Sequence, residues 1–311
     1  MPYTQVIDVN DMPIVEKDPW RNQYFEDVSC PEDLVIPTDD ELAYELSEEH
    51  RWVYNKVLIC RSQGIECGTD GAVPSRFPVF GKPVQNLRGM GIGTGVITTP
   101  AELRQSLDGE CMWMRLLEGE HISSDVAVIQ GKPVWWRHTK GIPAGRGTFD
   151  YWVVQSGTLP AVEESCGEWI EKYLAGYSGM INLETIGGLI IDCHLRFSDQ
   201  FVDLYGVGWL ESVIGLYSNG EWYFDDASRR TGYSVVLWGR HGMRYHHPDR
   251  KSVSALLEEP EVSSIQITFH EDSPPEAHAM PPGGFRLSVI NCWNLNAGKR
   301  VRRKLALLFG L

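Results

Sequence analysis

The residues best suited to chemistry lie at every second position of one short stretch: Asp192, His194 and Arg196. Side chains alternate between the two faces of a β-strand, so this spacing puts the three polar groups on one face. Glu184 lies across the dipeptide at 187–188, two glycines suited to a tight hairpin turn. A hairpin would gather carboxylates, an imidazole and a guanidinium, a set that suits Mg²⁺ and phosphates. An exposed polar sheet face is the alternative interpretation.

A single lysine in an apolar run is the second feature with chemical meaning. Residues 77–84 read as a buried strand whose one charge is Lys82, and a lone buried charge is costly unless it has a partner. Glycines at alternate positions follow: Gly89, Gly91, Gly93 and Gly95. Their amides can approach phosphates closely, although the spacing fits neither the Rossmann fingerprint nor the Walker A loop. A tight hairpin explains the glycines alone; combined with Lys82, they favour phosphate binding.

Composition sets the broad class of the protein. The chain has 311 residues, 42% hydrophobic and 23% charged, as expected for a globular protein with two or more subdomains. A formal charge of −14 argues against a general nucleic-acid binder, and the basic cluster at 299–304 reads as a solvated helix face. The sequence lacks an apolar run that could span a membrane, and its seven cysteines lack CxxC spacing. We expect a cytoplasmic protein without nucleic-acid or membrane partners.

Local patterns indicate the elements that must position these residues. Helices are expected at 41–46, after Asp39 and Asp40, and at 51–63, 99–103, 165–174, 207–217 and 297–309. Strands are expected at 77–84, 111–129, 133–137, 181–197, 233–238, 265–269 and 285–290. We expect a mobile loop at 139–148. The proposed division is a short N-terminal segment 1–54, a core 55–220 and a C-terminal α+β subdomain 221–311.

In their order and spacing, four motifs of this chain resemble the ATP-grasp family, ligases that join a carboxylic acid to an amine, thiol or similar nucleophile. The resemblance runs from about residue 55 to about residue 198, with a weaker echo in the C-terminal tail. The motifs are Asn55-Lys56, then Pro78-Val79-x-x-Lys82-Pro83 before the glycines, then Gly119-x-His121-x-Ser123-x-Asp125, and finally Asn182-x-Glu184 with Asp192-x-His194-x-Arg196. None is diagnostic by itself, and the fold that they imply is α+β, with two α/β subdomains clasping ATP.

The resemblance implies a role for each matching residue. Lys56, Lys82 and Arg196 would neutralise the ATP phosphates, and the glycine loop at 88–95 would close over them as a lid. Leu116 and Leu117 would offer backbone groups to the adenine. Mg²⁺ would be held by the remaining three: Glu184, Asp192 and His194. For the carboxylate and acyl-phosphate contacts we suggest the loop that contains Arg137, Lys140 and Arg146, with plain surface positions as the alternative.

Three departures from the family pattern bear on these expectations. His121 stands where the family places the glutamate that holds the ribose, and Glu120 is a candidate substitute. His194 stands for an asparagine, although Mg²⁺ prefers oxygen ligands. The stretch before residue 55 is also short for the family's N-terminal substrate domain. The acceptor site would then come from the C-terminal region, with 240–247 as one contributor, or from a partner subunit, for example in a homodimer.

The function implied by the resemblance is that of an ATP-dependent ligase. A small carboxylate or peptide would be activated as an acyl phosphate and joined to an amine or another nucleophile, with ATP and Mg²⁺ required. Two alternatives stay open at this point. One is a phosphotransferase that stops at a phosphorylated product, and the other is a degenerate ATP-binding protein without enzymatic activity.

Overall fold

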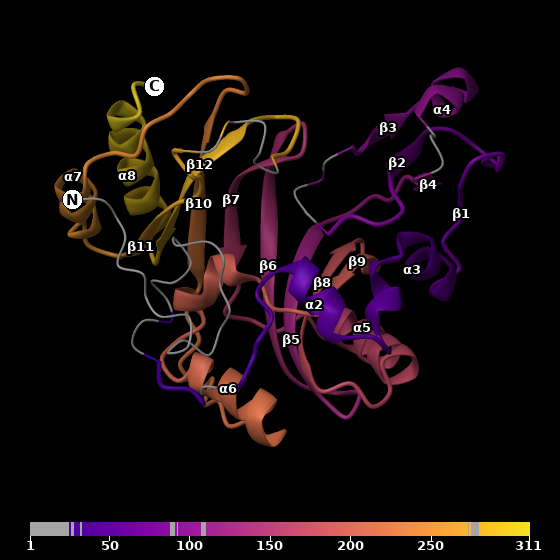
Figure 1. The fold of residues 1–311 in the computed structure, drawn as a ribbon, viewed down its shortest axis with the longest axis horizontal. Coiled ribbons are helices and arrows are strands. Elements are labelled where there is room, and N and C mark those ends of the chain that lie inside the picture. Colours follow the sequence, from indigo (N-terminus) through magenta and orange to yellow (C-terminus); the bar gives the residue numbers. More distant parts are fainter. Residues whose placement is uncertain are drawn as a thin grey trace.

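The computed structural model describes residues 25, 28–31, 33–87, 91, 93–106, 110–272, 274 and 280–311. These residues fold into two antiparallel sheets with helices packed against them, so the α+β class is confirmed (Figure 1). The small sheet lies on the right of this view, and the large sheet fills the centre and left. The central hairpin of the sequence lies where the two sheets meet.

The small sheet has the strand order β1-β4-β2-β3. Its strands are β1 (Cys67–Gly68), β2 (Val79–Pro83), β3 (Gly95–Ile97) and β4 (Cys111–Arg115). Two helices belong to this part of the chain: α3 (Lys56–Ser62) and α4 (Pro100–Ser106). The Asn55 side chain accepts hydrogen bonds from the backbone N–H groups of Val57 and Leu58, so it caps α3 and places Lys56 at the helix start.

The large sheet has eight strands in the order β11-β12-β10-β7-β6-β5-β8-β9. Their bounds are β5 (His121–Ile129), β6 (Lys132–Gly145), β7 (Thr148–Val154), β8 (Gly179–Ile186), β9 (Leu189–His194), β10 (Gly232–Gly239), β11 (Val262–Ile267) and β12 (Phe285–Cys292). β10 pairs with β7 as well as with β12, so hydrogen bonding continues from strands before residue 220 to strands after it.

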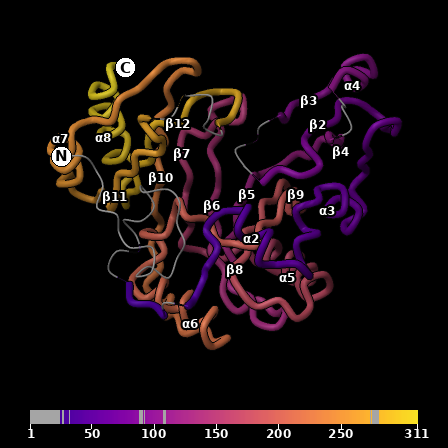
Figure 2. Tube along the Cα trace, viewed as in Figure 1, coloured from indigo at the N-terminus to yellow at the C-terminus, as the bar shows by residue number. Residues whose placement is uncertain are grey.

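Helices cover both faces of the large sheet. The helical elements are α2 (Asp40–Leu46), η2 (Arg51–Tyr54), α5 (Pro160–Tyr173), η3 (Asp199–Leu204), α6 (Trp209–Asn219), α7 (Arg250–Leu257) and α8 (Leu295–Leu308). One face packs against α5 and α8, and the other against η3 and α6. Figure 2 follows the described N-terminal segment, in indigo, from the neighbourhood of α6 to α2. Five of the helices expected from the sequence are confirmed with ends shifted by a few residues, whereas the helix expected at 51–63 is divided at Asn55 into η2 and α3, because Asn55 has an extended backbone and caps α3.

The predicted hairpin is present, whereas the predicted mobile loop at 139–148 is wrong. β8 and β9 are joined through Gly187 and Gly188, with φ angles of 59° and 83° that a primed turn requires. β6 instead continues to Gly145 and pairs with β7, because Ile142 and other apolar residues continue the strand pattern past the basic residues. The glycines of this segment make the turn itself, where Gly145 and Gly147 have φ angles of 106° and 78°.

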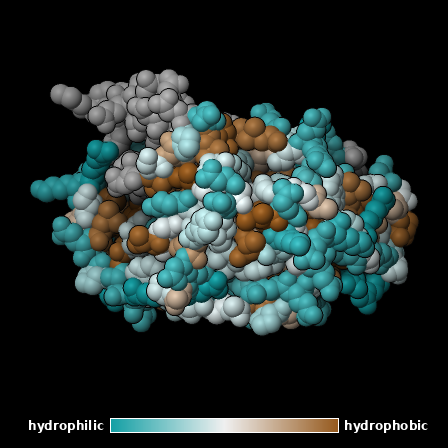
Figure 3. All heavy atoms as spheres, turned by 90° about the horizontal axis from the view of Figure 1, so that it is seen from below, coloured by the Kyte–Doolittle hydropathy of each residue, from teal (hydrophilic) through white to brown (hydrophobic). Residues whose placement is uncertain are grey.

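The described part of the molecule has an ordinary protein surface. None of its helices combines the length and the apolar character that crossing a membrane would take. Viewed from below, hydrophilic residues are interspersed with smaller hydrophobic groups (Figure 3). All seven cysteines are free thiols.

Candidate active site between the two sheets

The β8–β9 hairpin places its polar side chains as the alternation predicts. In the strand register Glu184 faces Asp192, and Asn182 faces His194. Residues that face each other across neighbouring strands share a face of the sheet. The Nε2 atom of His194 lies 4.0 Å from Oε1 of Glu184. The sequence-based expectation that these groups converge is therefore met in the structure.

Two lysines from the small-sheet side pair with Asp192. Lys56, at the start of α3, forms an ion pair with Oδ1 of Asp192, and Lys82 Nζ on β2 lies 3.7 Å from Oδ2. Lys82 also donates a hydrogen bond to the Ile191 carbonyl at 2.7 Å. Burial alone would raise the pKa of Asp192, but Lys82 and then Lys56 lower it to about 2. The partner that Lys82 needs within its apolar strand is thus a carboxylate of the same chain.

Glu184 is hydrogen-bonded to His121 at the start of β5. His121 Nε2 donates to Oε2 of Glu184 at 3.0 Å. Burial lowers the pKa of His121, but the hydrogen bond to Glu184 and its charge outweigh burial, so the net shift is upward. The His121 ring also lies beside Phe149 and Trp152, with ring centroids 5.4 and 5.6 Å away. His121 therefore joins the acidic hairpin to an aromatic group on β7.

Asp40 completes the cluster, and the sequence reasoning had treated it only as part of a helix start. Its Oδ1 accepts a hydrogen bond from His194 Nδ1 at 2.9 Å, and its Oδ2 accepts one from Arg196 at 2.9 Å. The Tyr54 hydroxyl donates to the same carboxylate at 3.3 Å. Burial would raise the pKa of Asp40, but Arg196 and then His194 hold it well below its usual range. The sequence indicated only that Asp40 lies at the start of a helix, and no local pattern pointed to its contacts with His194 and Arg196.

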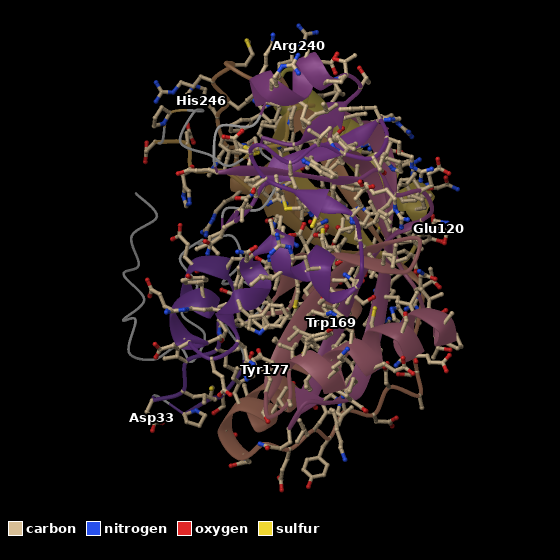
Figure 4. All side chains as sticks on the ribbon, turned by 90° about the vertical axis from the view of Figure 1, so that its right-hand side faces the viewer. Asp33, Glu120, Trp169, Tyr177, Arg240 and His246 are labelled. Carbon is tan, nitrogen blue, oxygen red and sulfur yellow. The ribbon has the colours of Figure 1, made fainter. Side chains whose placement is uncertain are left out.

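Lys140 lies on the opposite sheet face from the cluster. It faces Ile122, on the sheet face covered by α5, whereas His121 and Glu184 lie on the other face. Lys140 forms an ion pair with Glu120 instead, and Glu120 lies at the edge of the molecule (Figure 4). Neither residue reaches the cluster, and the ribose contact of Glu120 stays a prediction.

The other two residues predicted to contact the substrate carboxylate or the acyl phosphate are Arg137 and Arg146, and they lie elsewhere in the structure. Arg137 is fully buried, bound to Asp226 and to the carbonyl groups of Leu204 and Arg230, so it is a structural residue. Arg146 is exposed in the turn between β6 and β7, and its φ angle is 52°. Both residues lie outside the cluster because the expected loop is a long β-hairpin. Successive side chains along its strands lie on opposite faces of the sheet, and the end of the hairpin lies away from the sheet centre.

The hinge between the two sheets packs against the turn of the β8–β9 hairpin. Leu116 and Leu117 directly follow β4, and Leu117 packs against the same hydrophobic cluster as Leu189 and Ile191 of β9. A Cβ on Gly187 would lie only 2.4 Å from the Glu118 carbonyl oxygen. The segment proposed to contact adenine is thus fixed beside the charged cluster. In the glycine loop, Gly91 and Gly93 have φ angles of 61° and 70°, and Gly89 lies outside the described residues.

The cluster meets only part of what a bound cation requires. Across the described ranges, no three His, Cys, Asp or Glu side chains are grouped closely enough to hold a metal ion. Asp192 is paired with the ammonium groups of Lys56 and Lys82. The 4.0 Å between His194 Nε2 and Glu184 Oε1 is longer than the roughly 3 Å between adjacent ligands in octahedral coordination at about 2.1 Å. Glu184 and His194 would therefore have to move closer together to bind one cation as adjacent ligands.

The two sheets, the hinge and the hairpin between them define an ATP-grasp fold. Comparison with solved structures supports this class: the L-amino acid ligase from Bacillus licheniformis superposes with a TM-score of 0.58 at 13% identity, covering 82% of this chain and 72% of that chain. No family model matches the sequence, and no curated protein sequence matches it either.

Two further similar structures contain nucleotide. The carboxyaminoimidazole ribonucleotide synthase from asperigillus clavatus, complexed with ATP, has a TM-score of 0.56 at 12% identity and covers 83% of this chain and 73% of its own. The second is the biotin carboxylase domain of the Hydrogenobacter thermophilus 2-oxoglutarate carboxylase, in complex with MgADP and bicarbonate. It has a TM-score of 0.57 at 13% identity, and the match covers 88% of this chain and 73% of that chain. At these identities the likeness establishes the fold alone.

Proposed function

We propose that this protein is an ADP-forming ligase that activates a carboxylate with ATP and transfers the acyl group to an amine or a similar nucleophile. The observation that carries the proposal is the gathering of Lys56, Lys82 and Arg196 with the carboxylates of Glu184 and Asp192 between the two sheets. Cations for phosphates and oxygens for a metal are both present in one place. One similar structure is named as an L-amino acid ligase, and two others contain ATP or MgADP; together they support the same proposal.

In the proposed reaction the chain's residues position groups and neutralise charge. A carboxylate oxygen of the substrate attacks the γ-phosphorus of ATP, and the bond to the β–γ bridging oxygen breaks, giving an acyl phosphate and ADP. The nucleophile then attacks the acyl carbon and displaces phosphate. Lys56 and Lys82 would exchange Asp192 for phosphate oxygens, and Arg196 would bind the transferring phosphoryl group. Mg²⁺ or a similar cation would supply further charge neutralisation when held by Glu184, His194 and the released Asp192.

The lid and the adenine site belong to the same proposal. Residues 88–95 would cover the phosphates through backbone amides, and Leu116 and Leu117 would present backbone groups to the base. The carboxylate substrate would approach from the side of Phe149 and Trp152, because these partly exposed rings adjoin His121 on the face that carries Glu184. The proposed division at residues 54 and 220, a cytoplasmic location and a homodimer remain parts of this working model.

The test is a screen for ADP release. Amino acids and small carboxylic acids are supplied singly and in pairs with ATP and Mg²⁺, and mass spectrometry identifies the product. A ligase requires both a carboxylate and a nucleophile for rapid ADP release and yields a condensed product. A stable phosphorylated end product would establish a phosphotransferase instead. Nucleotide binding without any stimulated turnover would establish a non-enzymatic ATP-binding protein.

A further inference from the structure

A pocket lies between the loop that follows β10 and the end of α8. Its volume is about 740 Å³, a size typical of ligand pockets. Residues 240–246 form one wall, and residues 308–311 form the other. Arg240 and His246 of the first wall lie at the upper end of the molecule in Figure 4. Because β7 and β6 separate β10 from β5, the pocket is distinct from the cluster around His121.

The loop that forms the first wall is fixed by its own contacts. The Tyr245 hydroxyl accepts a hydrogen bond from the Arg240 backbone N–H at 2.7 Å, and the Tyr245 ring stacks on Phe285. His241 Nε2 donates to the Pro281 carbonyl at 2.8 Å. These contacts hold the backbone at Arg240 and leave its side chain exposed. The wall is therefore largely preorganised, which reduces the ordering cost of binding a ligand.

Two arginines of this wall are unpaired cations in an acidic protein. The formal charge of the chain is −14, yet within the described ranges no carboxylate pairs with the guanidinium group of Arg240 or Arg244. The basic residues of α8 differ, because four of them are paired: Lys299 and Arg302 with Asp150, and Arg300 and Lys304 with Glu259. The two loop arginines are thus available to a ligand carboxylate, which a guanidinium can bind with two hydrogen bonds.

Apolar side chains are exposed beside these arginines. The exposed fraction is 53% for Met243, 41% for Leu308 and 46% for Leu311, and the adjacent Leu307 is 74% exposed. Single exposed hydrophobic residues are ordinary, but a group of them rimmed by polar residues marks an interaction site. Methionine adapts its shape to different apolar partners. A ligand that fits this pocket therefore combines carboxylates with apolar side chains.

We propose that this pocket is a docking site for an acidic peptide segment of a partner protein. Its carboxylates pair with Arg240 and Arg244, and its apolar side chains pack on Met243 and Leu308. Charge complementarity favours this occupant. Adsorption to an anionic membrane typically uses clusters of about four to eight basic residues, whereas this site is concave and offers two free arginines. The inference goes beyond the proposed function and does not depend on it.

The experiment uses the full chain and an array of synthetic eight-residue peptides. Each peptide carries glutamates and two leucines or phenylalanines in varied spacing, and a matched peptide has glutamine in place of every glutamate. The wild type should bind a subset of the acidic peptides and none of their glutamine counterparts. For the best binder, fluorescence anisotropy should show that Arg240→Gln/Arg244→Gln lowers the affinity by about tenfold or more, because two charge-assisted contacts are lost.

A matched double variant controls for the change in net charge. Arg76 and Arg104 are exposed in the small-sheet part of the chain, and α4 and α8 lie on opposite sides of the molecule in Figure 1. Arg76→Gln/Arg104→Gln should therefore keep the wild-type peptide affinity. The apolar contacts are tested by Met243→Ser/Leu308→Ser, which should weaken binding by about tenfold. Circular dichroism should give the wild-type unfolding temperature for all three double variants, since the replaced side chains are exposed.

Four outcomes would overturn the proposal. The first is an array in which no acidic peptide binds more tightly than its glutamine counterpart, and the second is an equal loss of affinity in the control variant. The third is binding to phosphatidylcholine–phosphatidylserine vesicles that Arg240→Gln/Arg244→Gln abolishes, which would assign the pocket to a membrane surface. The fourth is a dimer in sedimentation velocity that the same variant abolishes, which would assign it to a second copy of this chain.

Discussion

Each cation that the cluster offers to phosphates is already paired with a carboxylate. Lys56 and Lys82 pair with Asp192, and Arg196 pairs with Asp40. Buried charges are expensive unless paired, so these contacts keep the site folded in the absence of nucleotide. Binding phosphates then requires an exchange of partners: the ammonium groups turn to phosphate oxygens, and Asp192 becomes free for a cation. Nucleotide and divalent cation should for this reason bind better together than separately.

Lys82→Met tests the phosphate assignment at a single residue. The variant keeps an apolar side chain in β2, and Lys56 still neutralises Asp192, so the fold should be retained. We expect a large loss of nucleotide affinity, because the variant lacks one of the two ammonium groups that would leave Asp192 and bind the phosphates. At a ligand concentration of 100 times Kd the wild type gains about 2.7 kcal/mol from binding, and the variant should gain almost none. Thermal unfolding with and without MgADP measures this.

Lys132→Met is the matched control for that measurement. Lys132 is exposed at the start of β6, away from the hairpin, so the same chemical change should leave the nucleotide-induced stabilisation at its wild-type value. Equal stabilisation of the Lys82 and Lys132 variants would show that Lys82 has only a structural role.

Asp125 gives a pH-dependent prediction. Burial raises its pKa to about 6, despite hydrogen bonds from Tyr205, Asn182 and the Ser198 backbone. Between pH 4 and pH 6 the folded protein keeps a proton that the unfolded chain has lost, so this group's contribution to stability falls as pH rises. The unfolding free energy of the wild type minus that of Asp125→Asn should decrease by an amount of the order of 3 kcal/mol from pH 4 to pH 7. Urea unfolding at the two pH values measures it, and a pH-independent difference would contradict it.

At the scale of elements, the β8–β9 hairpin both carries the acidic residues of the cluster and packs against the hinge. Its strands carry Glu184, Asp192 and His194, and its turn packs against the hinge that follows β4. Gly119 and Gly187 approach each other so closely that a Cβ on Gly119 would lie 2.7 Å from the Gly187 Cα. The position of the hinge is therefore set by the same turn that brings the carboxylates together, which couples the hinge to the acidic residues of the hairpin.

Alanine substitutions at the two turn glycines separate backbone strain from hinge packing. Both have positive φ, so either change costs about 1–2 kcal/mol of strain. Gly188→Ala should cost no more, because nothing lies within 4 Å of its Cβ position. Gly187→Ala must also push away the Glu118 carbonyl, so we expect a total loss of the order of 3 kcal/mol and weaker nucleotide binding. Chemical unfolding and calorimetry of both variants measure this, and identical results for the two would contradict it.

At the scale of the whole molecule, the large sheet ties the proposed core to the C-terminal region. β7 pairs with β10 from Gly232 to Val235, and the buried Arg137 of β6 is held by Asp226 and the Arg230 carbonyl. α8 covers the sheet over β10 and β12. Removing the residues after 220 would expose the edge of β7 and leave the buried Arg137 guanidinium with the Leu204 carbonyl but without Asp226 and the Arg230 carbonyl.

A truncated chain tests this integration. We expect residues 1–220 alone to lack a cooperative unfolding transition, whereas co-expression with residues 221–311 should restore one. Circular dichroism during thermal unfolding, with the intact chain as reference, provides the measurement. A fragment 1–220 that unfolds cooperatively and binds MgADP would show that the C-terminal region is dispensable for the nucleotide site.

The sequence by itself determined the hairpin, most helices and the convergence of Glu184, Asp192 and His194. These depend on local rules: alternation along a strand, glycines with positive φ and helix caps act over a few residues. The charge of Lys82 within an apolar run also indicated that a partner had to exist.

Tertiary structure decided which partners those groups have. Asp40 is 154 residues from His194, and the periodicity of neither segment connects them. The same holds for the assignment of Lys140 to the α5 face, because a shift of one residue in strand register would have moved it to the face of Glu184. Pairing between distant segments depends on how whole elements pack, and packing is a property of the complete fold. The sequence therefore defined the hairpin, whereas only the tertiary structure placed Asp40 against it.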